Sequence, residues 1–180
     1  MRIRLYEISI FRGCANKRNH IISLSEEEKS IMTGHAELAK DLFSKGYNCS
    51  QAVFAAFCDE TGMDRETALR LSSSFGGGMG KLREVCGAVS AMFLIAGLKT
   101  GNIDPADKSA KKQHYERIQS LAAQFEQQHE TIICRKLLGL PEGKDSPVPT
   151  ERDEKFYKER ICMKLVEDAA DIMDAFLQKN

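Results

Sequence analysis

Apolar residues recur about every three to four positions after residue 33, which is the spacing of amphipathic helices. In the first such segment, Leu38, Ala39 and Leu42 share one face. No alternating strand pattern of useful length appears after residue 12. The pattern predicts helices near 34–45, 49–61, 64–73, 84–98, 105–129 and 151–178, with a short helical segment around Cys134. We therefore expect an all-α fold, a single-domain multi-helix bundle.

Residues typical of helix ends separate these segments. Thr33, Asn48 and Asp64 can each cap the N-terminus of the helix that follows. The pair Asp104-Pro105 is expected to open the long fifth helix, because proline is favoured in a first helical turn. These residues set where we expect the helices to begin.

The first residues lack this periodicity. We interpret 1–31 as an N-terminal extension, with Met32 as an alternative start, and expect 32–180 to form the domain. Removing the extension is expected to leave a folded protein. Glu7 and Arg12 interrupt its apolar run and no small-residue cleavage site follows, so we expect no signal peptide and a cytoplasmic location.

Charge and composition argue against several classes of function. Lys plus Arg equals Asp plus Glu at 26 each, without a basic stripe, so no nucleic-acid partner is expected. The longest apolar stretch, 85–98, is too short to span a bilayer, so no membrane insertion is expected. His129 is expected to be solvated rather than a ligand, and the pair Glu167-Asp168 is expected on a solvated face or at a helix end.

Cysteines supply the main chemical clue. In a cytoplasmic chain, six cysteines are more often metal ligands or reactive thiols than structural disulfides. Cys49, Cys86, Cys134 and Cys162 fall on the predicted core faces of four different helices, two of them near helix N-termini, where a thiolate is favoured. Cys58 is expected to point away from Cys49. Burial of cysteine as a small core residue is the alternative interpretation of each position.

A glycine-rich loop precedes one of these cysteines. Five glycines stand close to Cys86 in the sequence: Gly76, Gly77, Gly78, Gly80 and Gly87. Phe75 occupies the position where a phosphate-binding Walker loop needs glycine, so nucleotide binding is not expected. We interpret the loop first as a flexible connection that lets two helices approach closely. The second interpretation is that its backbone N–H groups lie near a cofactor or substrate beside Cys86.

Several short elements occur in a characteristic order: Gly46-Tyr-Asn-Cys49-Ser-Gln-Ala, Gly76-Gly-Gly-Met-Gly80, Cys86-Gly87-Ala88, Cys134-Arg-Lys-Leu-Leu-Gly139 and Cys162. Over about residues 33–178, this order resembles the C_GCAxxG_C_C family, for which a redox role is proposed. The family's CGAxxG element usually ends in glycine, where this chain has Ala91. The resemblance implies that the four cysteines in these elements are functional.

The same resemblance suggests a cofactor. A similar cysteine set in split-Soret cytochromes is associated with an iron–sulfur centre. No CxxCH motif is present, so haem attachment is not implied. The first hypothesis is therefore a redox or electron-transfer protein whose four cysteines hold an iron–sulfur cluster, most simply [2Fe–2S], or cycle between thiol and disulfide.

Two other functions stay open. One is a non-catalytic helical module in which the same thiols bind structural zinc or form disulfides, and the other is an interaction protein with buried thiols and no cofactor. The first hypothesis requires a redox partner, and an oligomer is compatible with the sequence. It also predicts that the four sulfurs converge to metal-bridging or disulfide distance, with Cys58 apart.

Overall fold

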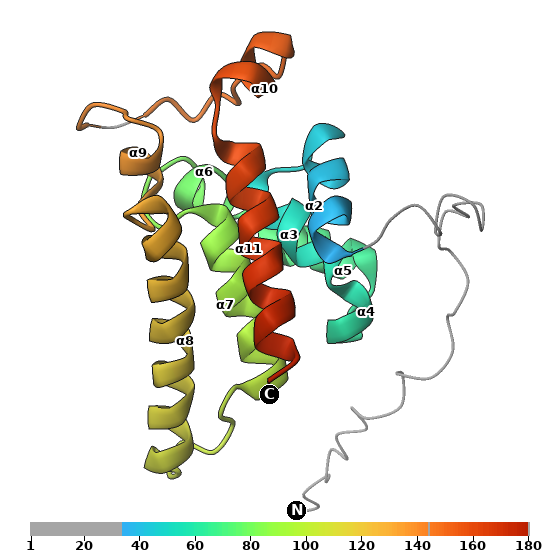
Figure 1. Cartoon of the computed structure of the whole chain (residues 1–180), viewed down its shortest axis with the longest axis vertical. Helices are drawn as coiled ribbons and strands as arrows, with labels where there is room; N and C mark the ends of the chain where they lie inside the picture. The colour runs from blue at the N-terminus through green and yellow to red at the C-terminus, as the bar shows by residue number, and fades with distance from the viewer. Residues whose placement is uncertain (1–33, 144, 180) are drawn as a thin grey trace, which may run out of the picture. The chain divides into compact units, whose positions relative to one another are not determined.

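The computed structural model describes residues 34–143 and 145–179, and every regular element in this part of the chain is an α-helix (Figure 1). The chain divides into two units, 1–32 and 33–180. The expected extension, Cys14 and the expected cap Thr33 lie outside the described residues. A single backbone bridge joins Val85 to Ile133 without extending into a described strand. The expected all-α fold is confirmed.

The described helices, in chain order, are α2 His35–Ser44, α3 Cys49–Ala56, α4 Cys58–Thr61, α5 Arg65–Ser73, α6 Gly76–Met79, α7 Gly87–Thr100, α8 Lys108–His129, α9 Cys134–Leu137, α10 Glu154–Glu159 and α11 Cys162–Leu177.

The core forms around α7, which packs against α3, α8 and α11. Its sequence is apolar on nearly every side, which is the pattern of a helix surrounded by others. Helix α2 packs against both α3 and α11. Phe54 and Phe57 on one side of α7, and Phe125 on the other, are fully buried. Helices α6, α9 and α10 gather at one end of α7, α8 and α11 in Figure 1.

Two of the expected caps are confirmed. Asn48 accepts a hydrogen bond from the backbone of Gln51, whose side chain accepts one from the Asn48 N–H in return. Asp64 caps α5 by accepting from the N–H of Thr67. The expected opening of the long helix at Pro105 is wrong, because Asp107 caps α8 and the helix begins at the next residue.

The expected continuous helix over 151–178 is also wrong. Arg160 adopts an extended conformation, with φ −97° and ψ 130°, and separates α10 from α11. The two helices bury different surfaces: the rings of Phe156 and Tyr157 on α10 pack against Phe43, whereas the apolar side of α11 faces the core. As a result Cys162 begins a helix instead of lying within one.

The expectation that His129 and Asp168 are solvated is wrong. Their side chains are 7% and 9% exposed, and His129 Nε2 lies 3.0 Å from a carboxylate oxygen of Asp168. Lys164 also binds that carboxylate, at 2.6 Å. The contact joins the end of α8 to α11, so these residues hold two helices together.

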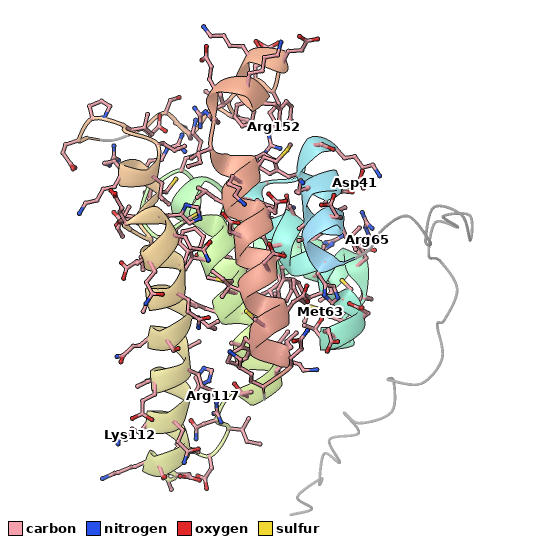
Figure 2. The ribbon with its side chains drawn as sticks, in the orientation of Figure 1. Asp41, Met63, Arg65, Lys112, Arg117 and Arg152 are labelled. Carbon is pink, nitrogen blue, oxygen red and sulfur yellow. The ribbon has the colours of Figure 1, made fainter. Side chains whose placement is uncertain are left out.

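Charged side chains cover the outer surface of α8, with Lys112 near the end opposite to Arg152 and α10 in Figure 2. Leu121, Phe125 and the side chain of His129 are its buried groups, and most of its 22 residues are exposed or half-buried. Within the described ranges, no helix combines the length and apolar character needed to cross a membrane.

Candidate functional site

Each of the four candidate cysteines stands at the start of a helix. Cys49 is the first residue of α3, and Cys86 is the N-cap of α7. Cys134 and Cys162 are the first residues of α9 and α11. Because the backbone N–H groups at a helix start carry partial positive charge, this position favours a thiolate.

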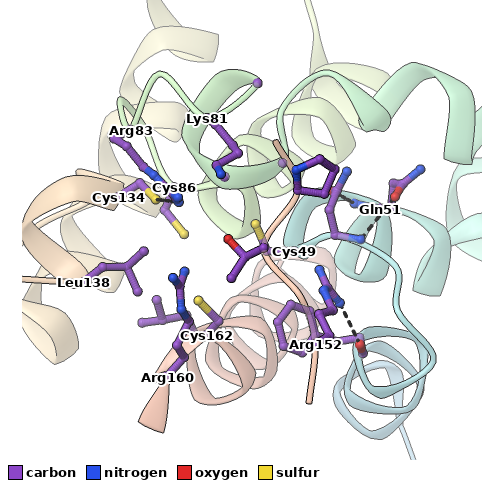
Figure 3. Close-up of a pocket in the computed structure, with 18 of the residues that line it drawn as sticks. Cys49, Gln51, Lys81, Arg83, Cys86, Cys134, Leu138, Arg152, Arg160 and Cys162 are labelled. Carbon is purple, nitrogen blue, oxygen red and sulfur yellow. Dashed lines mark hydrogen bonds between the residues drawn. The ribbon is translucent and has the colours of Figure 1, made fainter. Parts of the chain in front are cut away.

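The four cysteines line one cavity of about 410 Å³ at the end of the bundle where α6, α9 and α10 lie. Figure 3 shows the labelled cysteines around this opening, with Arg160 beside Cys162. Cys58 does not line the cavity and is half-buried on α4. The structure therefore brings the four predicted cysteines to one cavity and leaves Cys58 elsewhere.

A short backbone ladder places Cys86 next to Cys134. The N–H of Cys86 donates to the carbonyl of Ile132, and the N–H of Cys134 donates to the carbonyl of Glu84, both at 2.7 Å. The isolated bridge lies between these bonds. The helix expected to start at residue 84 starts at Gly87 instead, because residues 84–86 form this ladder.

Cys49 is the thiolate of the site. The hydrogen bond from Cys86, with further bonds from the backbone N–H groups of Gly77, Ser50 and Gly87, lowers the pKa of Cys49 to about 6 despite burial. At neutral pH Cys49 is therefore mostly ionised, and the form present is the nucleophilic one.

The other three thiols keep their protons. The hydrogen bond to Cys49, followed by burial, raises the pKa of Cys86. Burial raises the pKa of Cys134, although a hydrogen bond from Arg83 opposes this. Burial, followed by the charges of Cys49 and Cys134, raises the pKa of Cys162 to about 12. The cavity thus contains one thiolate, with Cys86 as the thiol that donates to it.

The glycine-rich loop fits closely around these sulfurs. A Cβ atom on Gly78 would lie 2.6 Å from the Cβ of Cys134, and one on Gly87 would lie 2.5 Å from Cys49 Sγ. A Cβ on Gly76 would overlap the Asn48 side chain. Gly78 and Gly87 therefore allow the backbone to approach Cys134 and Cys49 closely, which agrees with the close approach in the first interpretation of the loop.

The loop also has an unusual backbone. Residues 77–81 all have positive φ, between 59° and 71°, including the non-glycine residues Met79 and Lys81. A side chain strains such a conformation, so it persists where surrounding structure enforces it. Here it directs the Gly77 N–H at Cys49.

Arg83 was missed by the sequence interpretation. Its side chain is 5% exposed, its Nε donates to Asp145 at 2.6 Å, and its Nη1 lies 3.8 Å from Cys134 Sγ. A buried arginine beside a thiol stabilises the thiolate form of that thiol. Arg83 follows the glycine-rich loop and could have been suspected only from that position.

The five described cysteines are free thiols. In the described part of the chain, no three Cys, His, Asp or Glu side chains are grouped closely enough to hold a metal ion. Cys49 and Cys86 influence each other's pKa, and Arg83 Nη1 lies 3.8 Å from Cys134 Sγ. The four sulfurs thus share a cavity, and the described residues form no group of three metal ligands there.

The profile of a protein family described as "Putative redox-active protein (C_GCAxxG_C_C)" matches residues 47–176. The chain belongs to this family. All four cavity cysteines of this C_GCAxxG_C_C protein, and its glycine-rich loop, lie in the matched segment. Cys58 lies there too, so the match alone does not separate it from the other four. No curated protein and no solved structure gives a match.

Proposed function

We propose that this C_GCAxxG_C_C protein transfers two electrons by cycling Cys49 and Cys86 between dithiol and disulfide. The observation that supports this most directly is that Cys49 and Cys86 line one cavity at the starts of α3 and α7, where interaction with Cys86 lowers the pKa of Cys49 to about 6. An ionised thiol next to a protonated one provides a nucleophile and a resolving group. The proposed location is the cytoplasm, where reduced thiols persist.

The reaction uses the two residues in sequence. The Cys49 thiolate attacks one sulfur of an oxidised disulfide, breaks its S–S bond and forms a mixed disulfide, and the other sulfur leaves as a thiolate. Cys86 then passes its proton to the thiolate released in the first step and attacks Cys49 Sγ. The second sulfur of the substrate leaves, and the substrate is reduced by two electrons while the Cys49–Cys86 disulfide forms. A reducing redox partner returns the pair to the dithiol.

A second candidate is supported by the presence of four thiols where a dithiol reaction needs two. Cysteine thiolates are the ligands of iron–sulfur clusters, so the donor set suits one, and the cationic lining complements the negative charge of four thiolates. Cys49, Cys86, Cys134 and Cys162 would hold it, after Cys134 and Cys162 approach the other two. Such a cluster would supply one-electron transfer.

Anaerobic purification followed by thiol counting separates these functions. The dithiol function predicts a colourless protein that loses two thiols, those of Cys49 and Cys86, on oxidation. The cluster predicts visible absorption, with iron and acid-labile sulfide bound. Stoichiometric zinc without oxidisable thiols would instead support the structural alternative.

Two variants sharpen the comparison. Cys162→Ser should leave the two-thiol oxidation intact if the dithiol function is correct, and should abolish or weaken the chromophore if a cluster is present. Cys86→Ser should abolish the activity under both functions. Cys58→Ser is the matched control, because Cys58 lies outside the cavity and its loss should change neither result.

A further inference from the structure

Among the described residues, the thiol cavity is lined by four cationic side chains and by no carboxylate; the cations are Lys81, Arg83, Arg152 and Arg160. Lys81 and Arg83 both face Asp145, at 4.0 Å and 2.6 Å. The single carboxylate of Asp145 thus compensates part of the charge of two cations, and the Cys49 thiolate adds one more negative charge. The cavity still has an excess of positive charge.

Arg152 and Arg160 account for this excess, since neither is paired with a carboxylate of the described residues. Arg152 Nη1 donates to the carbonyls of Phe43 and Tyr47, at 3.1 Å and 2.9 Å. Its remaining N–H groups are not used by these bonds. Both guanidinium groups therefore retain donors for a ligand.

An aromatic ring holds the two guanidinium groups in place. The Arg152 guanidinium carbon lies 5.3 Å from the centre of the Phe156 ring, and that of Arg160 lies 5.0 Å from it. Arg152 also lies 4.7 Å from the centre of the Phe43 ring. Two like charges around one ring repel each other, and carboxylates bound to the two guanidinium groups would offset this repulsion. The planar guanidinium fork matches a carboxylate.

We propose that the substrate of the Cys49–Cys86 pair is a small disulfide carrying carboxylate groups, which Arg152 and Arg160 bind. The proposal rests on the dithiol function proposed above. A volume of about 410 Å³ is typical of a small-molecule site, which makes a low-molecular-weight disulfide the appropriate size. The carboxylates bind the arginines, and the S–S bond is presented to Cys49, which attacks it as described above.

Three disulfides of similar length and different charge test this proposal: dithiodipropionate with two carboxylates, bis(hydroxyethyl) disulfide with none, and cystamine with two ammonium groups. The rate constant for mixed-disulfide formation at Cys49 is measured for each by acid quenching and mass spectrometry. Each rate constant is divided by that for the reaction of the same disulfide with a small neutral thiol, which corrects for the intrinsic reactivity of the disulfide. The wild-type protein should prefer dithiodipropionate over the neutral disulfide by about tenfold or more, with cystamine slowest.

The variant Arg152→Gln/Arg160→Gln should lose this preference, so that the ratio of the dithiodipropionate rate to the bis(hydroxyethyl) disulfide rate falls toward one. The rate with bis(hydroxyethyl) disulfide, the neutral substrate, also reports whether the variant is folded. Lys155→Gln/Lys158→Gln is the matched control, because it removes the same charge from α10 at exposed residues outside the cavity. It should retain the preference.

The outcomes separate the two proposals. Reaction of Cys49 with all three disulfides at similar normalised rates would overturn the anionic substrate and leave the dithiol function standing. An equal loss of preference in the lysine control would likewise overturn it, by assigning the effect to net charge. No reaction of Cys49 with any of the three would overturn both proposals.

Discussion

The sulfur of Cys49 lies directly against Gly87, the first residue of α7, so that a Cβ atom on Gly87 would stand 2.5 Å from it. The same glycine donates its N–H to that sulfur. The absence of a side chain therefore permits the contact that helps to ionise Cys49. Cys49 and α7 are brought together by a residue that has no functional group of its own.

Replacing Gly87 with alanine should displace the Cys49 sulfur and lengthen its hydrogen bond from the backbone. We expect the pKa of Cys49 to rise. The free energy of unfolding should fall by about 1–3 kcal/mol, which is typical of overpacking at a buried position. Thermal melting and the pH dependence of Cys49 alkylation measure the two effects.

Gly97→Ala is the matched control on the same helix. A Cβ there meets nothing within 4 Å, and alanine in a helix interior is favoured over glycine by about 0.5–1 kcal/mol. This variant should be as stable as the wild type or more stable, with the pKa of Cys49 unchanged. Equal behaviour of the two variants would contradict the role given to Gly87.

The ionisation of Cys49 gives a second prediction. Its rate of alkylation should rise with pH around a midpoint of about 6 and level off near neutrality. Cys86→Ala should move that midpoint upward, because the hydrogen bond from Cys86 is the largest cause of the lowered pKa, while the backbone donors remain. Cys58→Ala should leave it in place. A midpoint that stays near 6 without Cys86 would assign the ionisation to the backbone alone.

The fold, more than the site, was predictable from the sequence. Apolar spacing and the caps Asn48 and Asp64 located most helices, since these signals act within one turn of the chain. The break at Arg160 contains neither glycine nor proline and does not interrupt the apolar spacing. It follows from the packing of α10 on Phe43, a residue more than 100 positions away, and local patterns do not report such contacts.

The site depends even more on distant contacts. The four cysteines could be selected by their helical faces and by family resemblance, but their pairing could not. Cys86 lies next to Cys134 because the adjacent residues Val85 and Ile133 form a backbone bridge. A bridge of one residue pair is too short to produce an alternating strand pattern in the sequence. Arg152 and Arg160 lie in a segment expected to be one helix, where charged residues usually indicate a solvated face.

His35 on α2 gives a prediction about stability. Its Nδ1 contacts Asp174 on α11, its Nε2 lies 3.2 Å from Asp59 on α4, and its ring stacks on Phe57 at 4.1 Å. Burial lowers the pKa of His35, but the hydrogen bonds and charges of Asp174 and Asp59 outweigh it and raise the pKa overall. The protonated imidazole therefore stabilises the folded protein.

This stabilisation is complete below the unfolded-state pKa of about 6.5 and is lost as the pH rises through the folded-state pKa. Cys49, with its lowered pKa, acts in the opposite direction, so the test uses a difference between proteins. The difference in unfolding free energy between wild type and His35→Gln should be largest near about pH 5–6 and shrink toward about pH 8.

The central claim, that Cys49 and Cys86 form the redox pair, is tested most directly by identifying the disulfide that forms first. The reduced full-length protein is treated with one equivalent of a neutral disulfide, remaining thiols are blocked in acid, and the linked peptides are identified by mass spectrometry. The dithiol function predicts a Cys49–Cys86 bond, with Cys58, Cys134 and Cys162 recovered as blocked thiols. Recovery of Cys49 and Cys86 as thiols, with another pair linked, would contradict it.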